Sequence, residues 1–253
     1  ESISIVIPCY NEAENIIKIH SKLTAIFSTI PAYDYEIIFV DDGSNDATPL
    51  VLLELFKSDT KHVRALELSR NFGKEAALTA GIDHANGDAV IPLDADMQDP
   101  PELIPALIAE WQNGFDVVLA KRSNRDKDSL LKRQTARFFY SIHNGISDLK
   151  IPSNVGDFRL LSRKVADTIR KLPERQRFMK GLFAWAGFKT TAIEYQRMSR
   201  DLGSTKFSGW SLWNLALEGI TSFSTAPLRI WTYIGATIAF LTLAYGLFII
   251  ANT

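Results

Sequence analysis

The residues best suited to chemistry are two aspartates, Asp94 and Asp96, with Gln98 following at the same spacing. An apolar run at residues 89–92 precedes them and predicts a buried strand. Because side chains alternate between the two faces of a strand, we expect the three polar groups to point the same way. Carboxylate and amide oxygens suit Mg²⁺ or Mn²⁺, so the spacing predicts a metal site. The alternative is a polar turn, since aspartates are common in turns.

The elements that must position these residues alternate between strand and helix patterns. Strands are predicted at residues 3–7, 35–40, 65–68, 89–92 and 116–120, and helices near residues 12–29, 46–58, 74–85 and 101–113. This order predicts an α/β fold: a Rossmann-like, mostly parallel sheet with helices on both faces. In such sheets ligands bind beyond the carboxyl ends of the strands, where this sequence is polar. We therefore expect a phosphorylated ligand at that edge.

The composition limits the class of protein. A net charge of −1 over 253 residues argues against a protein that coats nucleic acid, and we expect no nucleic-acid partner. The single cysteine, Cys9, cannot form an internal disulfide and is expected to be an inert small residue.

An uncharged run at residues 230–251 predicts a transmembrane helix. A buried helix of a soluble protein is the alternative. The basic residues before the run predict a cytoplasmic N-terminal domain by the positive-inside rule. Because the chain begins at Glu1 without methionine and ends at Thr253, we expect a piece of a longer protein. The number of further spans stays open.

Two other stretches, residues 129–146 and 208–223, are amphipathic at helical spacing. They either lie in the membrane interface or pack on the globular core. The second stretch runs almost directly into the uncharged run, which favours the interface.

Three segments occur in the order seen in family 2 glycosyltransferases of the GT-A fold, which this chain resembles: residues 5–12, 40–44 and 93–101. Residues 70–78, 156–160, 175–181 and 200–207 are similar to the polyisoprenyl-phosphate branch of that family. The branch includes dolichyl-phosphate mannose synthase, and the resemblance is strongest to the bacterial bactoprenol (undecaprenyl-phosphate) glucosyltransferases. It implies a GT-A domain at residues 1–207, an interfacial helix and linker at 208–228, and a transmembrane helix at 229–253.

The resemblance also implies an activity. It indicates a membrane-bound inverting transferase that moves one sugar, glucose from UDP-glucose, onto a polyisoprenyl phosphate at the cytoplasmic face of the inner (plasma) membrane. Two alternatives stay open: the same chemistry with GDP-mannose or a UDP-amino sugar, and a catalytically silent nucleotide-binding scaffold on the same fold. A homo-oligomer is also left open.

The roles implied for single residues fall into four groups. Nucleotide binding is expected of Pro8, Tyr10, Glu12, Asp42 and Asp94, and metal binding of Asp94, Asp96 and Gln98. Catalysis is expected of Asp157, Asp96, Arg200 and Lys206, and binding of the acceptor phosphate of Arg122, Arg125 and Lys206, with Arg159 a weaker candidate.

For some of these residues the chemistry narrows the role. Tyr10 offers a ring to stack on a base. A lipid phosphate is already anionic and needs no strong base, so Asp157 is expected to orient a group, unless it only shapes a loop before a strand at residues 158–161. Lys74 either reaches the nucleotide or is a solvated helix residue. Asp41 and Ser44 are equally consistent with a structural turn.

Overall fold

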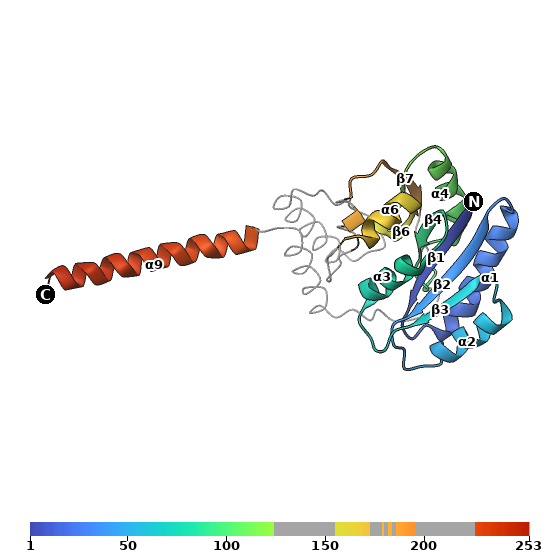
Figure 1. Ribbon diagram of the computed structural model, residues 1–253, viewed down its shortest axis with the longest axis horizontal. Coiled ribbons are helices and arrows are strands. Elements are labelled where there is room, and N and C mark those ends of the chain that lie inside the picture. The colour runs from blue at the N-terminus through green and yellow to red at the C-terminus, as the bar shows by residue number, and fades with distance from the viewer. Residues whose placement is uncertain (124–154, 173–178, 180–181, 184–185, 196–225, 253) are drawn as a thin grey trace.

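The structure is a computed structural model, and it describes residues 1–123, 155–172, 179, 182–183, 186–195 and 226–252 (Figure 1). Within them, seven strands form one sheet in the order β3-β2-β1-β4-β6-β5-β7. The strands are β1 Ser2–Cys9, β2 Asp34–Asp41, β3 Val63–Glu67, β4 Ala89–Pro92, β5 Val117–Arg122, β6 Val155–Ser162 and β7 Thr190–Tyr195. The five strands predicted from the alternating pattern are all present, β6 contains the strand named at residues 158–161, and β7 is additional.

The predicted mostly parallel sheet is confirmed, with one exception. β1 pairs in parallel with β2 and β4, β2 with β3, and β5 with β7. β6 runs antiparallel to both of its neighbours, β4 and β5. The start of β6 therefore lies at the same edge of the sheet as the carboxyl ends of the parallel strands.

The helices cover both faces of the sheet, as the sequence predicts (Figure 1). The helices that cover the sheet are α1 Ala13–Thr29, α2 Thr48–Ser58, α3 Lys74–His84, α4 Ile104–Gln112 with the short 3₁₀ turn η1 Pro101–Leu103 before it, and α6 Arg163–Arg170; α9 Ala226–Asn252 lies apart from it. The two prolines at residues 100–101 begin the η1–α4 segment, where a missing N–H costs nothing. α6 lacks a counterpart in the sequence prediction.

The central strands carry apolar runs because both of their faces are covered. On β1, Ile5 and Ile7 pack in one core with α1, α2 and α4, whereas Val6 packs in a second core with α3 and α6. Ile37 and Ile38 of β2 divide in the same way. Burying one such side chain fully contributes about 1.5–3 kcal/mol, so the central strands are fixed in place by both layers.

The uncharged run forms the helix α9, which stands clear of the sheet (Figure 1). Its segment Arg229–Asn252 has 24 residues, a mean hydropathy of 2.2 and no buried part. A helix of that length is about 36 Å long, and a bilayer core is about 30 Å thick. By length and composition, α9 could cross a membrane. The amphipathic stretches at residues 129–146 and 208–223 lie outside the described residues.

Candidate active site

The loops after β1 and β2 are tied together by polar side chains. Ser44 Oγ donates to Asp41 Oδ1 over 2.5 Å and accepts from Asn11 N–H over 2.9 Å. Asn11 Oδ1 in turn accepts from Asn45 N–H over 2.9 Å. Asn11 has a φ of 55°, a left-handed conformation that Asn tolerates better than most residues. Asp41 and Ser44 therefore shape the turn, one of the two roles left open by the sequence.

The predicted nucleotide-binding residues lie on these same loops. Pro8 is near the end of β1, and Tyr10 and Glu12 follow it; all three are half-buried. Glu12 Oε2 accepts from Asn15 Nδ2 over 2.7 Å, which orients its carboxylate at the start of α1. Between them, Cys9 is buried. Burial, with the nearby Glu12, raises the pKa of the Cys9 thiol well above its usual range, which keeps the thiol protonated as expected of an inert residue.

Asp42 connects these loops to the next one. It is buried, and its two carboxylate oxygens accept N–H bonds from Phe72 and Gly73 over 2.8 and 2.9 Å. Gly73 has a φ of 96° and immediately precedes α3. The backbones also touch, because a Cβ on Gly43 would lie 2.5 Å from the carbonyl carbon of Arg70. Asp42 thus fixes the point from which α3, and its first residue Lys74, begin.

Lys74 lies between two of the predicted site residues. Its Nζ is 2.6 Å from Asp94 Oδ1 and 2.6 Å from Asp157 Oδ2. Burial disfavours the charge on Lys74, but Asp157 and Asp94 outweigh burial and raise the pKa of Lys74 well above its usual range. Burial raises the pKa of Asp94; Lys74 opposes this shift, and Asp157 and Asp96 add to it. Lys74 is therefore an ion-paired group within the site, and the prediction of a solvated helix residue is wrong for it.

The segment that carries Asp94, Asp96 and Gln98 differs in part from the prediction. β4 ends at Pro92, and residues 95–96 form a turn, so the segment is not a continued strand. Exposure still alternates: Leu93 and Ala95 are buried, whereas the three polar residues are half-buried. Gln98 N–H donates to Asp96 Oδ1 over 3.2 Å. The three polar groups thus stay partly accessible to solvent along a turn.

The described residues contain no cluster of three or more His, Cys, Asp or Glu placed to hold a metal ion. Among these residues, Asp96 and Asp157 both lie close enough to Asp94 to affect its charge, and Lys74 pairs with Asp94 and Asp157.

Asp157 reaches the site because β6 is reversed. It is the third residue of β6, so the alternative in which it only shapes a loop before a strand at 158–161 is wrong. Since β6 lies beside β4 and runs antiparallel to it, the start of β6 lies at the edge where β4 ends. Arg159, two residues further on, is buried; its Nη2 donates to the carbonyl of Gly156 over 2.6 Å. The Arg159 guanidinium therefore stabilises the start of β6, which makes Arg159 a weaker candidate for binding the acceptor phosphate.

A second polar group surrounds Arg122 at the end of β5. Its Nε donates to Tyr195 Oη over 3.3 Å, and its Nη2 lies 3.6 Å from Asp99 Oδ1. The Tyr195 hydroxyl also donates to Asp99. Burial, together with Asp99, raises the pKa of Tyr195 above its usual range, so the hydroxyl keeps its proton. Arg122 is thereby held in one orientation.

Asp99 and Tyr195 were not predicted as site residues. Asp99 had a signal, because it directly follows the aspartate pair and precedes two prolines. Nothing in the sequence pointed to Tyr195, because its strand, β7, was not predicted. Arg125, Arg200 and Lys206 lie outside the described residues.

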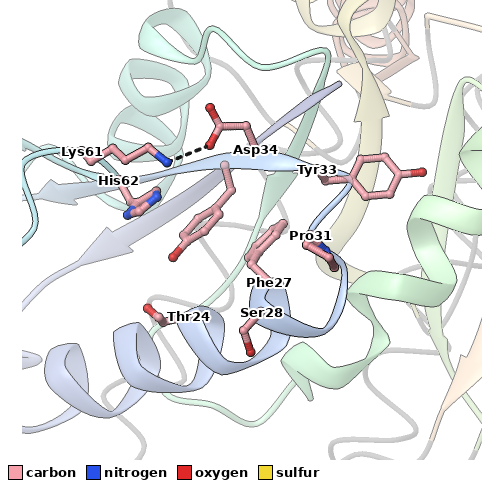
Figure 2. Close-up of a pocket in the computed structure, with 9 residues that line it drawn as sticks. Thr24, Phe27, Ser28, Pro31, Tyr33, Asp34, Lys61 and His62 are labelled. Atoms are coloured by element: carbon pink, nitrogen blue, oxygen red, sulfur yellow. Dashed lines mark ion pairs between the residues drawn. The ribbon is translucent and has the colours of Figure 1, made fainter.

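A hollow of about 430 Å³ opens at the opposite edge of the sheet, where β2 and β3 begin (Figure 2). Its base is a stack in which the rings of Phe27 and Tyr35 lie 4.3 Å apart and those of Tyr35 and His62 lie 4.4 Å apart. Lys61 and Asp34 form an ion pair at its rim (Figure 2). None of the predicted site residues lines it, so it is separate from the acidic site.

A mostly parallel α/β sheet, with acidic residues of the β4 end and of β6 gathered at its carboxyl edge, defines the class of the GT-A glycosyltransferases. The chain belongs to one family of that class: the sequence model described as Glycosyl transferase family 2 matches residues 4–170. The protein is accordingly a glycosyltransferase.

Individual relatives agree with this assignment. The chain is 55% identical over 251 residues to the prophage bactoprenol glucosyl transferase homolog of Escherichia coli (strain K12), covering 99% of this chain and 81% of that protein. Two solved structures share the fold. Mannosyl-3-phosphoglycerate synthase from Rubrobacter xylanophilus has a TM-score of 0.59 at 16% identity, covering 93% of this chain and 75% of that one. Glucosyl-3-phosphoglycerate synthase from Mycobacterium tuberculosis, in complex with Mn²⁺, UDP-glucose and phosphoglyceric acid, has a TM-score of 0.53 at 18% identity, covering 87% and 77%.

Proposed function

We propose that this protein is a membrane-bound, inverting glucosyltransferase, which moves one glucose from UDP-glucose onto a polyisoprenyl phosphate. The observation that carries the proposal is the gathering of Asp94, Asp96 and Asp157 at the ligand edge of a chain 55% identical to a bactoprenol glucosyl transferase homolog. In the reaction, a phosphate oxygen of the lipid forms a bond to C1 of glucose. The bond from C1 to the donor diphosphate breaks, and UDP leaves with the electron pair.

The acidic residues fit a divalent cation. Asp94 and Asp96 are both half-buried, and Asp96 lies close enough to Asp94 to disfavour its charge, so a cation bound at this turn would relieve their repulsion. We assign Mg²⁺ or Mn²⁺ to Asp94, Asp96 and Gln98; a metal of this kind is supported by the Mn²⁺ bound in the structure of glucosyl-3-phosphoglycerate synthase, which shares the fold. When bound, such an ion acts as a Lewis acid that stabilises the charge of the departing diphosphate. With few protein ligands, coordination positions stay open for phosphate oxygens.

The nucleoside is assigned to the loops after β1 and β2, with Pro8, Tyr10, Glu12 and Asp42. Tyr10 supplies a ring for stacking on the base, and Glu12 supplies a carboxylate that accepts ribose hydroxyl donors. Asp42 contributes mainly by holding the loop before α3, because both of its oxygens already accept backbone N–H bonds.

The acceptor side of the site needs positive charge, since one anion attacks another. Arg122, held by Asp99 and Tyr195, lies at the end of β5 and is proposed to bind the acceptor phosphate. Arg125, Arg200 and Lys206 keep their predicted roles in this proposal. The lipid oxygen is already anionic, so Asp157 orients a group of the sugar or acceptor and need not remove a proton. Its pairing with Lys74 suits an orienting role.

The membrane anchor is assigned to α9. We place the catalytic domain at residues 1–207 on the cytoplasmic side of the inner (plasma) membrane, followed by an interfacial segment at 208–228 and the membrane helix at 229–253. The apolar acceptor tail and the 24-residue apolar segment of α9 would then share the same bilayer.

The test offers the purified full chain UDP-glucose, GDP-mannose or UDP-N-acetylglucosamine, each sugar labelled, with a short polyprenyl phosphate and Mn²⁺. Labelled glucosyl lipid is the expected product. Transfer from another donor would correct the sugar and keep the chemistry. Tight UDP binding without transfer of any sugar would overturn the proposal and favour a silent scaffold.

A further inference from the structure

Lys74 pairs with one of the two carboxylates assigned to the metal. Its Nζ is 2.6 Å from Asp94 Oδ1, and Asp94 is one of the two carboxylates assigned to the cation. The second contact, to Asp157 Oδ2, is equally short. A divalent ion and an ammonium on the same carboxylate would repel each other at short range. The two cations therefore compete for Asp94.

The net charge around Asp94 depends on Lys74. Asp157 and Asp96 both lie close enough to Asp94 to disfavour its charge. Lys74 is the cation paired with Asp94 and Asp157. Removing its charge leaves a strongly anionic pocket, and a divalent ion binds such a pocket more tightly than a neutralised one.

The side chain of Lys74 can leave without moving the backbone. Lys74 is the first residue of α3, and its backbone is fixed because both carboxylate oxygens of Asp42 hold the preceding loop. The side chain itself is 38% exposed, and Asp94 is 29% exposed, so the pair opens towards solvent at the ligand edge. A flexible four-carbon stem lets an ammonium exchange one anionic oxygen for another nearby. A diphosphate at this edge provides such oxygens.

We propose that Lys74 is an internal counter-ion, which neutralises Asp94 and Asp157 until the diphosphate of the donor accepts its ammonium. Divalent metal then binds weakly to the free protein and tightly to the protein with nucleotide. The two ligands are thus positively coupled, and each raises the affinity for the other by the same factor. The inference rests on the proposed function for the identity of the donor, but the coupling itself needs only a nucleoside diphosphate.

The test measures Mn²⁺ binding by electron paramagnetic resonance, on the full chain in detergent, with and without UDP. In the wild-type protein, UDP should tighten Mn²⁺ binding by about tenfold or more, a usual size for such coupling. In Lys74→Met, Mn²⁺ alone should bind about tenfold more tightly than in the wild type, and the effect of UDP should shrink. Lys57→Met, at an exposed position of α2, is the matched control and should behave as the wild type.

Lys74→Met leaves carboxylates unpaired and can destabilise the protein. A second comparison reduces this problem to one carboxylate, Asp94: Asp157→Asn against the double variant Lys74→Met/Asp157→Asn, which differ only in Lys74. The double variant should bind Mn²⁺ alone more tightly. Equal or weaker Mn²⁺ binding, in folded protein and in both comparisons, overturns the inference. If Mn²⁺ binding fails in this way while the wild-type protein transfers glucose, only the counter-ion role of Lys74 is refuted. If Mn²⁺ binding behaves as predicted but the wild-type protein transfers no sugar, only the proposed function is refuted.

Discussion

Replacing Asp42 with asparagine tests how firmly the site is built on the loop before α3. The carboxylate is 3% exposed, and its two oxygens accept the N–H groups of Phe72 and Gly73 over 2.8 and 2.9 Å. Asparagine keeps the shape but has one oxygen. One bond becomes a weaker neutral bond, and the other becomes a contact between two donors.

The size of the effect follows from these contacts. A hydrogen bond to a charged group contributes about 1.5–3 kcal/mol, and a buried donor left without an acceptor costs about 1–3 kcal/mol. Because Asp42 is nearly inaccessible, solvent replaces little of this loss. We expect Asp42→Asn to lower the free energy of unfolding by about 2–4 kcal/mol, since the two effects overlap. For a domain of this size that is a fall in Tm of about 4–16 °C.

The assay is thermal unfolding of the full chain in detergent, followed by circular dichroism. Glu54→Gln, an exposed change on α2, serves as the control and should leave Tm within about 1 °C of the wild type, as surface substitutions usually do. Glucose transfer by the Asp42 variant should also fall, because Lys74 directly follows the loop. If Asp42→Asn unfolds at the wild-type temperature, the loop is held by other contacts and the reasoning fails.

Three further expectations concern the site and the fold, and a fourth concerns the anchor. Asp96→Asn should abolish metal-dependent glucose transfer with an unchanged circular dichroism spectrum; full activity would refute the metal assignment. Tyr195→Phe removes a contact of Arg122, so the KM for polyprenyl phosphate should rise more than kcat falls, and an unchanged KM would refute the positioning role. Burial raises the pKa of Glu36, but bonds from Ser4, the backbone of Asn86 and Arg64 outweigh it and lower that pKa overall. The stability that Glu36 contributes is therefore present above the unfolded pKa of about 4.3 and is lost as pH falls towards the folded value. Glu36→Gln should be less stable than the wild type near pH 7, by urea unfolding, and the gap should narrow below pH 4; a gap that stays constant would contradict the shift. Deleting residues 230–253 should release the protein from membranes on fractionation, whereas continued tight association would refute α9 as the main anchor.

The sequence predicted the elements that are buried on both faces. β1 and β2 carry continuous apolar runs because helices cover each side, and such runs are visible without knowledge of the fold. β7 was missed because it is the last strand of the sheet and most of its residues are partly or fully exposed, so its pattern is weakly apolar. α6 has only eight residues, too few for a clear helical period.

The site was predictable as a set of residue types, but its internal pairings were not. Asp94 and Asp96 follow a buried strand, and that local signal suffices to find them. The pairing of Lys74 with Asp157 could not be predicted, since the two residues are 83 positions apart and meet only because β6 runs antiparallel to β4. The contact between Tyr195 and Asp99, 96 residues apart, depends in the same way on the place of β7 in the sheet.

The reversed strand β6 also determines which residues reach the ligand edge. β5 ends at Arg122, and β6 begins at Val155, with Lys121 paired to Val155 in the sheet. The connection between them, residues 123–154, therefore leaves from the ligand edge and returns to it. A parallel neighbour would have required the chain to cross back to the far edge. The reversal of this one strand therefore brings Arg122, the last residue of β5, and Asp157, near the start of β6, to the edge of the sheet where β4 ends.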